Sequence, residues 1–322
     1  MTRNVRRRNS RRRRSGGNPR SSPDSGIHSD VISNTDPFHA SAQGAKLFDS
    51  VAGHSVPFQC RQVTTLSTDA NGLGAINLTP LLQAAYRLDA TWTANQVTTW
   101  GTPAVYPEAV STITAGRYRI VNFGVRILGT VAPINASGVV TIFSQAEFVP
   151  NGFDVGSSLA EQVTRVPLHS LDHQWVSKPT GSESRLHDVS AADYGQIDWT
   201  TCTVAVLGGP ASTSVITVEC VLNIEFLPEP SSALTRIATP AAPHDIGRQM
   251  AIANVHRALP HVHHQSESIA AKVMHMLGNY VGAKALQTGM RYAGFLAPPA
   301  FRPAALAGGK FISNWSAIKD VD

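Results

Sequence analysis

The segment from Arg117 to Leu128 constrains the fold more than any other part of the chain. Its large apolar residues are separated by polar or small ones, and they are Tyr118, Ile120, Phe123, Val125 and Ile127. This period of two is typical of a β-strand that buries one face. The period slips at Val121 and Asn122, and the slip predicts a β-bulge. We therefore expect a β-sheet protein in which Val125 faces the core.

Further segments between residues 57 and 230 share this β-type composition, at 59–66, 74–78, 138–143, 202–207 and 214–226. Turn-forming residues such as Gly208, Gly209 and Pro210 separate them. Within this region only residues 81–88 and 158–163 are expected to be helical. Seven or eight short strands predict an all-β fold, an eight-stranded jelly-roll β-sandwich, which we assign to residues 46–230.

Residues 1–45 form a separate basic arm. Residues 1–20 contain nine arginines and no acid, whereas the remainder carries 18 basic and 22 acidic residues, a net charge of −4. Because like charges repel and Gly, Pro and Ser break helices, we expect the arm to be disordered. Guanidinium groups match phosphate oxygens, so the arm is predicted to bind nucleic acid with a steep salt dependence. The binding residues are Arg3, Arg6, Arg7, Arg8, Arg11, Arg12, Arg13, Arg14 and Arg20.

Sequence-specific recognition by this arm is not expected, because it contains no aromatic residue for base stacking and no zinc motif. Two other interpretations of an arginine-rich tail are a nuclear-import signal and a solubilising tail. A nuclear-import signal is compatible with nucleic-acid binding.

Residues 231–322 form a C-terminal extension that begins with a Pro-rich linker. Helical periodicity appears at 246–259 and again at 268–295. Apolar residues of the second helix fall on one side, and they are Ile269, Val273, Met276, Leu277, Tyr280 and Val281. A weakly basic amphipathic helix of this kind can lie in a membrane interface. The alternative is an ordinary buried helix that packs beneath the sandwich.

Six histidines lie within 32 residues of this extension: His244, His256, His261, His263, His264 and His275. With ordinary pKa values near neutrality, such groups gain charge in an acidified compartment. Metal binding by His261, His263 and His264 is a second interpretation, although no carboxylate or Cys stands at ligand spacing. The third is a polar surface.

The three cysteines, Cys60, Cys202 and Cys220, form no paired motif, which fits a reducing compartment. The basic N-terminus is not followed by the apolar stretch of a signal peptide, and no run of 18 apolar residues exists. We therefore expect a soluble protein that is intracellular when made. Phosphate-binding loops, nucleophile elbows and zinc-protease motifs are absent from the sequence, so we do not expect an enzyme.

Residues 115–127, AGRYRIVNFGVRI, are followed by Thr130 and Gly138. This segment resembles the strand with a G-R-x-R-V-V-x-x-G-x-R pattern in coat proteins of small icosahedral viruses of the tombusvirus and nodavirus type. Residues 207–214 and 218–228 are similar to the end of that domain, where the last strand leaves toward a C-terminal extension. The order of basic arm, sandwich and Pro-rich exit fits the same family.

The resemblance implies a capsid protein that self-assembles into an icosahedral shell, with the arm inside packaging a genome expected to be single-stranded RNA. Its implied location is the virion and, during assembly, the host cytoplasm. The arginine-rich arm also allows import into the nucleus. The helical extension departs from the protruding β domain of tombusviruses. It is closer to nodaviruses, whose internal C-terminal helices contact genome and membrane. The competing function is that of an RNA-binding protein that does not assemble, such as a silencing suppressor or chaperone.

Two family features would need particular residues. Nodavirus-like coats cut themselves at an Asn–Ala bond near the C-terminus, but the one such pair here is Asn135–Ala136, with Asp69 as the candidate acid. We expect no self-cleavage. Interface calcium would need converging oxygens from Asp188, Asp193 and Asp198, which we expect to be solvated loop acids, so no cofactor is expected.

One short motif lies within the arm. Residues 24–29 match the D-S-G-x-x-S pattern that animal ubiquitin ligases recognise after double phosphorylation. A kinase would reach it in a disordered arm.

Overall fold

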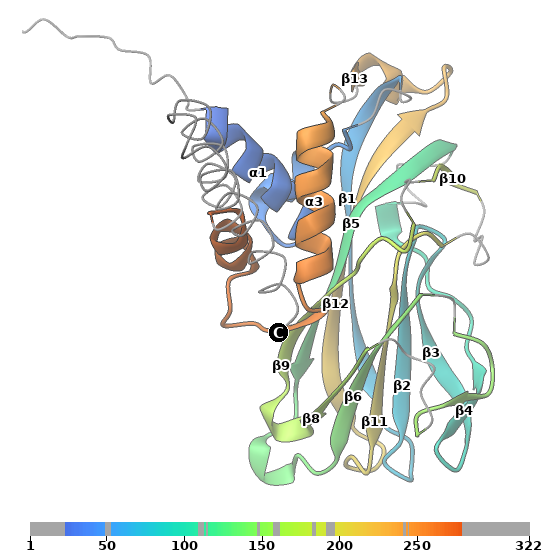
Figure 1. Cartoon of the computed structure of the whole chain (residues 1–322). Coiled ribbons are helices and arrows are strands. Elements are labelled where there is room, and N and C mark those ends of the chain that lie inside the picture. The colour runs from blue at the N-terminus through green and yellow to red at the C-terminus, as the bar shows by residue number, and fades with distance from the viewer. Residues whose placement is uncertain are drawn as a thin grey trace, which may run out of the picture.

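The computed structural model describes residues 23–48, 53–108, 113, 115–146, 149–156, 162–181, 185–190, 197–240, 243 and 245–278. Two antiparallel sheets pack face to face (Figure 1). In the first sheet the order is β13 (Thr239–Pro240), β1 (His54–Ser67), β12 (Ser214–Pro228), β5 (Gly116–Gly129), β9 (Asp172–Val176) and β14 (Val262–His264), and β10 (His187–Asp188) also pairs with β5. In the second sheet the order is β7 (Phe153–Asp154), β4 (Gln96–Trp100), β3 (Ala84–Thr93), β2 (Gly74–Leu81), β11 (Thr201–Leu207), β6 (Val139–Gln145) and β8 (Gln162–Pro167).

The strands of the jelly roll pair from the two ends of its sequence toward the middle. β1 pairs with β12, β2 with β11, β5 with β9, and β6 with β8, each in antiparallel register. Successive pairs lie alternately in the first and the second sheet. This nested pairing is the jelly-roll topology, and the expected eight-stranded jelly roll is confirmed, with β3 and β4 added beside β2.

The core lies between the sheets, and β5 contributes to it as its alternation predicts. Val125 is fully buried in this core. In the register with β12, Asn122 faces Asn223 and Ile120 faces Ile224, so Val121 is the extra residue of a β-bulge. The predicted bulge is therefore present, and it keeps apolar residues on both sides of it directed into the core.

The expected helix at 81–88 is wrong. β2 ends at Leu81, and the chain turns through Leu82 and Gln83 into β3. Leu81, Leu82 and Ala85 are fully buried, and a short run that is buried on both faces has no period that separates a strand from a helix. The expected helix at 158–163 is also not observed where it can be checked, because residues 162 and 163 belong to β8 and residues 158–161 lie outside the described ones.

The N-terminal segment is ordered from Pro23, and the expectation of disorder up to residue 45 is wrong for this part. It forms α1 (Pro23–Thr35) and the 3₁₀ helix η1 (Ala40–Gly44). Val31 and Ile32 are buried against residues more than 200 positions away in sequence, and such tertiary partners cannot be read from local composition. Residues 1–22, which include all nine arm arginines, lie outside the described residues.

The C-terminal extension is helical as predicted. After the short 3₁₀ helix η5 (Ala233–Arg236) comes α3 (Ile246–Ala258), whose N-cap Asp245 accepts a hydrogen bond from the Arg248 amide at 3.1 Å. Residues 269–278 form a further helix, here called the C-terminal helix, and the rest of the helix expected at 268–295 lies outside the described residues. Within the described ranges, no helix reaches the length and hydropathy that crossing a membrane requires. All three cysteines are buried free thiols.

Candidate functional site

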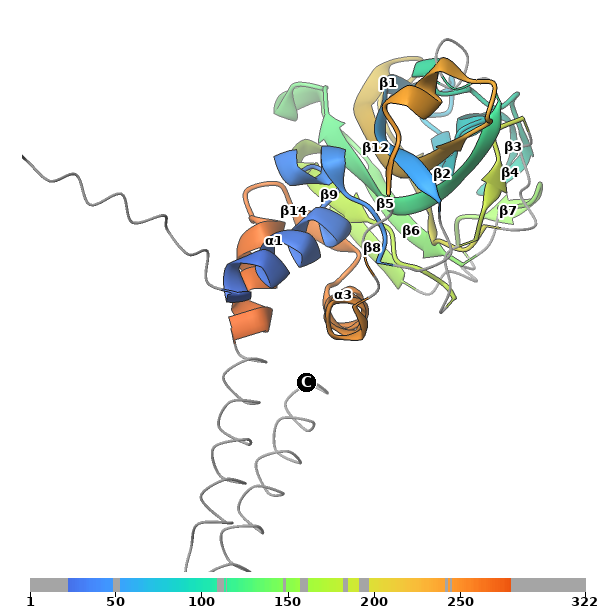
Figure 2. The same cartoon turned by 90° about the horizontal axis from the view of Figure 1, so that it is seen from above.

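Three helices cover the outer face of the first sheet. α1, α3 and the C-terminal helix lie together on the side away from the second sheet, and we call them the helical layer (Figures 1 and 2). Their shared apolar cluster also includes Val176 of β9. Its buried members are Val31, Ile32, Val176, Ala251, Val255, Leu259, Ile269, Val273 and Leu277. The two ends of the described chain thus meet on one face of the sandwich.

Two asparagines fix the N-terminal segment to the sheet. Asn122 donates to the Ser33 carbonyl at 2.8 Å, and Asn223 donates to the Pro37 carbonyl at 3.0 Å and to Asn122 Oδ1 at 2.7 Å. All of these bonds are buried, so each amide holds a backbone group that would otherwise be unpaired. The residues after α1 are therefore held on β5 and β12 by directional contacts.

Gly124 allows this close approach. A Cβ at this position would lie 2.8 Å from the rings of both Pro37 and Phe38, closer than side chains tolerate. Phe38 in turn lies under the Arg126 guanidinium, whose carbon is 4.1 Å from the ring centroid. Segment 37–38 consequently packs directly on the β5 backbone.

A buried ion pair lies beneath residues 46–48. Arg119 Nη2 lies 2.7 Å from Glu225 Oε2, with 3% of the arginine side chain and none of the glutamate side chain exposed. Glu225 also accepts hydrogen bonds from the Ser55 hydroxyl at 2.5 Å and the Leu47 amide at 3.2 Å. Lys46 donates to the Ser55 and Thr239 carbonyls at 2.8 and 2.9 Å. This network joins β5, β12, β1 and the N-terminal segment.

The predicted nucleic-acid-binding arginines cannot be placed, because they lie outside the described residues. The described residues contain 13 Lys and Arg and 15 Asp and Glu, a net charge of −2. Positive charge is thus concentrated outside the described fold, and residues 1–20 hold the largest share of it.

The expected membrane-active stripe is covered by protein where it is described. Ile269, Val273 and Leu277 have 2%, 0% and 3% of their surface exposed, and Met276 is half-buried. They contact α1 and α3 within the helical layer. Tyr280 and Val281 lie outside the described residues. In this state the described stripe serves as helix packing.

Three of the six clustered histidines are buried, so the polar-surface interpretation is wrong for them. Burial lowers the pKa of His256, His261 and His263 to about 4 in each case, and nearby lysines add to the shift. His264 and His275 are exposed, and His244 is not described. No group of three metal-ligating side chains gathers anywhere in the described ranges.

The other candidate residues are separated by the fold. Asp198 is buried and bonded to His187 at 3.1 Å, whereas Asp188 is exposed and Asp193 is not described. Asp69 accepts hydrogen bonds from two amides of its own turn. Asn135 ends a short 3₁₀ turn after β5. The D-S-G-x-x-S residues begin α1, so they are helical where we expected a disordered arm.

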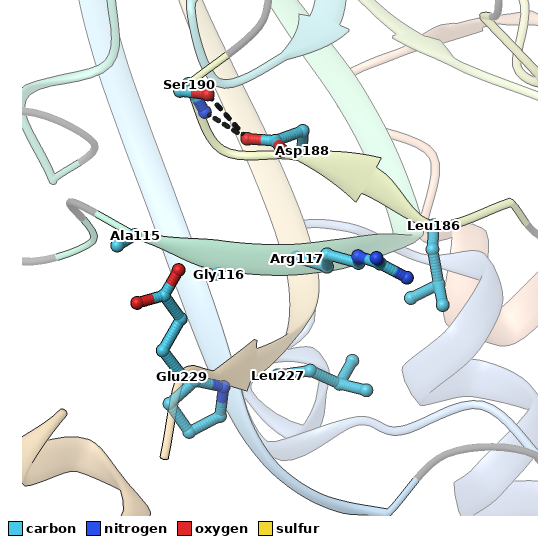
Figure 3. A pocket seen from close by; sticks show the side chains of 9 residues that line it. Ala115, Gly116, Arg117, Leu186, Asp188, Ser190, Leu227 and Glu229 are labelled. Carbon is cyan, nitrogen blue, oxygen red and sulfur yellow. Dashed lines mark hydrogen bonds between the residues drawn. The ribbon is translucent and has the colours of Figure 1, made fainter. Parts of the chain in front are cut away.

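A shallow cleft of about 490 Å³ lies at one end of the sandwich (Figure 3). It is lined by Arg117 of β5, Asp188 of β10 and Glu229, which follows β12. Ser190 donates to Asp188 through its amide and its hydroxyl, and these bonds lower the pKa of that carboxyl. One cation and two carboxylates around an open cleft do not identify a class of ligand.

Comparison with known proteins identifies the architecture. No protein-family model and no curated protein sequence matches the chain. The VP2 subviral particle of infectious bursal disease virus has a similar structure, with a TM-score of 0.51, 8% identity and coverage of 79% of this chain and 99% of VP2. The structure of the Gx strain of the same virus gives a TM-score of 0.53, 8% identity and coverage of 78% and 99%. The chain has the fold of a viral capsid protein.

Within this capsid fold, the residues that sequence reasoning missed are mainly polar and buried. Arg119 and Glu225 stand opposite each other on neighbouring strands, as do Asn122 and Asn223. Each is a polar residue inside a strand whose other face is apolar, which predicts solvent exposure in an isolated sandwich. The polar residues on this face of β5 and β12 do not by themselves mark a second layer, because a solvent-exposed face has the same composition.

Proposed function

We propose that the protein is a viral capsid protein that self-assembles into an icosahedral shell and packages the viral genome through its arginine arm. The observation that carries this proposal is the structural similarity of 79% of this chain to almost the whole length of VP2, a particle-forming protein. At 8% identity the similarity concerns the fold, so assembly is the step to be tested.

The distribution of charge supports the packaging role. The described fold has a net charge of −2, whereas the arm carries +9. A fold without excess positive charge cannot neutralise a packed polyanion, and nine guanidinium groups can release many counterions from phosphates. Binding through phosphates carries no sequence specificity of its own. The arm therefore suits a genome of any sequence, and single-stranded RNA is the genome that we propose.

Electron microscopy of the purified full-length protein tests the assembly. Uniform closed shells are the expected result, and monodisperse small oligomers would instead support the competing function of a non-assembling RNA-binding protein. Deletion of residues 2–20 tests the packaging. The deleted chain should retain the far-ultraviolet circular dichroism of the sandwich but lose nuclease-resistant nucleic acid. Protection of full-length nucleic acid by the deleted chain would contradict the role assigned to the arm.

Treatment of extracted nucleic acid with ribonuclease or deoxyribonuclease then identifies the genome type. The proposal places the protein in the virion and, during assembly, in the host cytoplasm. No catalytic step and no metal ion is part of the proposed function.

A further inference from the structure

Residues 245–278 of the C-terminal extension join the first sheet through one short strand, β14. β14 pairs with β9, placing Val262 opposite Trp175, and the Val176 amide donates to the His261 carbonyl at 2.8 Å. α3 precedes β14 and the C-terminal helix follows it, so this junction connects both helices to the sheet. Three buried histidines, His256, His261 and His263, lie at the junction, with 5%, 5% and 2% of their surface exposed.

His261 contacts both sheets, through Trp175 and Val176 of β9 and Ser144 of β6. Its Nδ1 atom lies 3.0 Å from the Val176 carbonyl oxygen and 3.2 Å from the Ser144 hydroxyl. Its ring stacks on Trp175 at 5.8 Å between centroids and 15° between planes. Stacking on an indole favours a charged imidazole, but burial and the cation of Lys178 outweigh it and lower the pKa of His261 to about 4.

His263 binds a cation through its neutral form. Its Nδ1 atom lies 3.3 Å from Lys272 Nζ on the C-terminal helix. An ammonium group only donates, so Nδ1 must accept, and protonation of this ring removes the acceptor and places two cations in contact. Lys272 also pairs with the exposed carboxylate of Glu267, which offsets part of that repulsion.

His256 lies on α3 and faces both the sandwich and α1. Its ring meets the edge of Trp199 at 5.6 Å, and it hydrogen-bonds the backbone of Asn34. The Lys178 ammonium lowers the pKa of all three rings. His261 also lowers the pKa of His256, and His263 lowers that of His261. The carboxylate of Glu267, beside His263, raises the pKa of that ring and so opposes part of the shift.

We infer that the junction of β9 with α3 and β14 is an acid-sensitive latch, which neutral His256, His261 and His263 hold closed and their protonation opens. Opening detaches residues 245–278 from the first sheet. The latch belongs to the fold of the single chain and does not depend on the proposed shell.

The direction of the pH effect follows from the two states. In a detached segment each histidine regains an ordinary pKa near 6.5, whereas in the closed latch it is about 4. The latch therefore has its full stability above pH 6.5 and loses it as pH falls toward 4. At pH 5.5 each histidine favours the open state about 10-fold, so the three together favour it by up to roughly 1000-fold.

Hydrogen–deuterium exchange of the full-length protein at pH 7.5 and 5.5 tests the latch, with rates corrected for the pH dependence of intrinsic exchange. Protection of residues 245–278 should fall by up to about 1000-fold at pH 5.5, while β12 stays protected. Unchanged protection in 245–278, or equal loss in β12, would overturn the latch.

Two variants assign the effect to the histidines. His256→Asn, His261→Asn and His263→Asn together should abolish the pH response, because Asn keeps an amide donor and acceptor but does not titrate. His54→Asn, His169→Asn and His275→Asn, all at exposed positions outside β14, form the matched control and should keep the response. A response that survives in the first set, or disappears in the control, contradicts the assignment.

Lys178→Met provides a test that leaves every histidine in place. Removing this cation raises the pKa of the three buried rings toward 6.5, so the loss of protection at pH 5.5 should be several-fold smaller than in the wild type. This variant decides the question if the triple Asn variant does not fold. An unchanged loss of protection in Lys178→Met would contradict the latch.

Discussion

Arg119 on β5 lies directly opposite Glu225 on β12, and their 2.7 Å ion pair is almost completely buried. The carboxylate also receives hydrogen bonds from Ser55 on β1 and from the backbone of Leu47. One side chain on β12 thus holds both β5 and the region around Leu47 and Ser55, which lie more than 60 residues apart in sequence. This pair lies on the outer face of the first sheet, where an uncovered sandwich would expose its charges to water.

Removing one partner of this ion pair should lower the free energy of unfolding more than removing both charges together. Arg119→Met leaves a buried carboxylate without its cation and should lower the free energy of unfolding by about 3–5 kcal/mol. Arg119→Met combined with Glu225→Gln removes the buried charge and keeps one acceptor oxygen, which can still receive the Ser55 hydroxyl, so it should lose less. Urea unfolding of the full-length protein, followed by circular dichroism, measures both. Equal losses in the single and double variants would show that charge burial is not the dominant effect.

Val125→Asp should unfold the sandwich. Val125 is fully buried between the sheets, and an unpaired carboxylate there costs several kcal/mol against a typical domain stability of about 5–15 kcal/mol. The matched control is Val63→Asp on β1, where 56% of the residue is exposed. Circular dichroism and particle yield should be lost in the first variant and kept in the second. Normal particles from Val125→Asp would show that the core face is misassigned.

The arm should set the salt dependence of nucleic-acid binding. Replacing Arg11, Arg12, Arg13 and Arg14 by Ala should reduce the slope of log K against log salt by about 3, since each phosphate contact with a single strand contributes about 0.7. Fluorescence anisotropy with a single-stranded RNA oligonucleotide measures the slope. Exposed arginines of the described fold, for example Arg236 and Arg257, supply a control that should leave the slope unchanged.

Membrane disruption should require acid. Ile269, Val273 and Leu277 are buried in the closed latch, so the full-length protein should leave anionic liposomes intact at pH 7.5. At pH 5.5 the open latch uncovers this stripe and adds positive charge, at about 1 kcal/mol for each charge near the lipid surface. Dye release measures the effect. Equal leakage at both pH values, or none at either, would show that the stripe serves only in packing within the helical layer.

Much of the β architecture could be predicted from local sequence. The alternation in β5 indicates its buried face, and the slip at Val121 indicates the bulge, because a strand with one buried face repeats every two residues. The same rule failed at residues 81–88, where both faces are buried and the period disappears. α3 was also predicted, because its apolar residues recur at helical spacing.

The candidate sites could not be predicted as fully from local sequence patterns. The sequence showed six clustered histidines, but whether a histidine titrates near neutrality depends on its burial and its neighbours. His261 is buried only because β14 adds to β9, and its lysine neighbour Lys178 comes from a segment more than 80 residues away. The buried partners of Val31 likewise come from the other end of the chain.

The sequence by itself determined the jelly-roll strands, the basic arm and the helical C-terminal extension, because each depends on local period or composition. Only the tertiary structure decided that residues 23–48 and 245–278 meet on the outer face of the first sheet. It also decided which polar residues are buried there. Burial and pairing arise between segments that are distant in the chain, and no local pattern of residues encodes which distant segment will cover them.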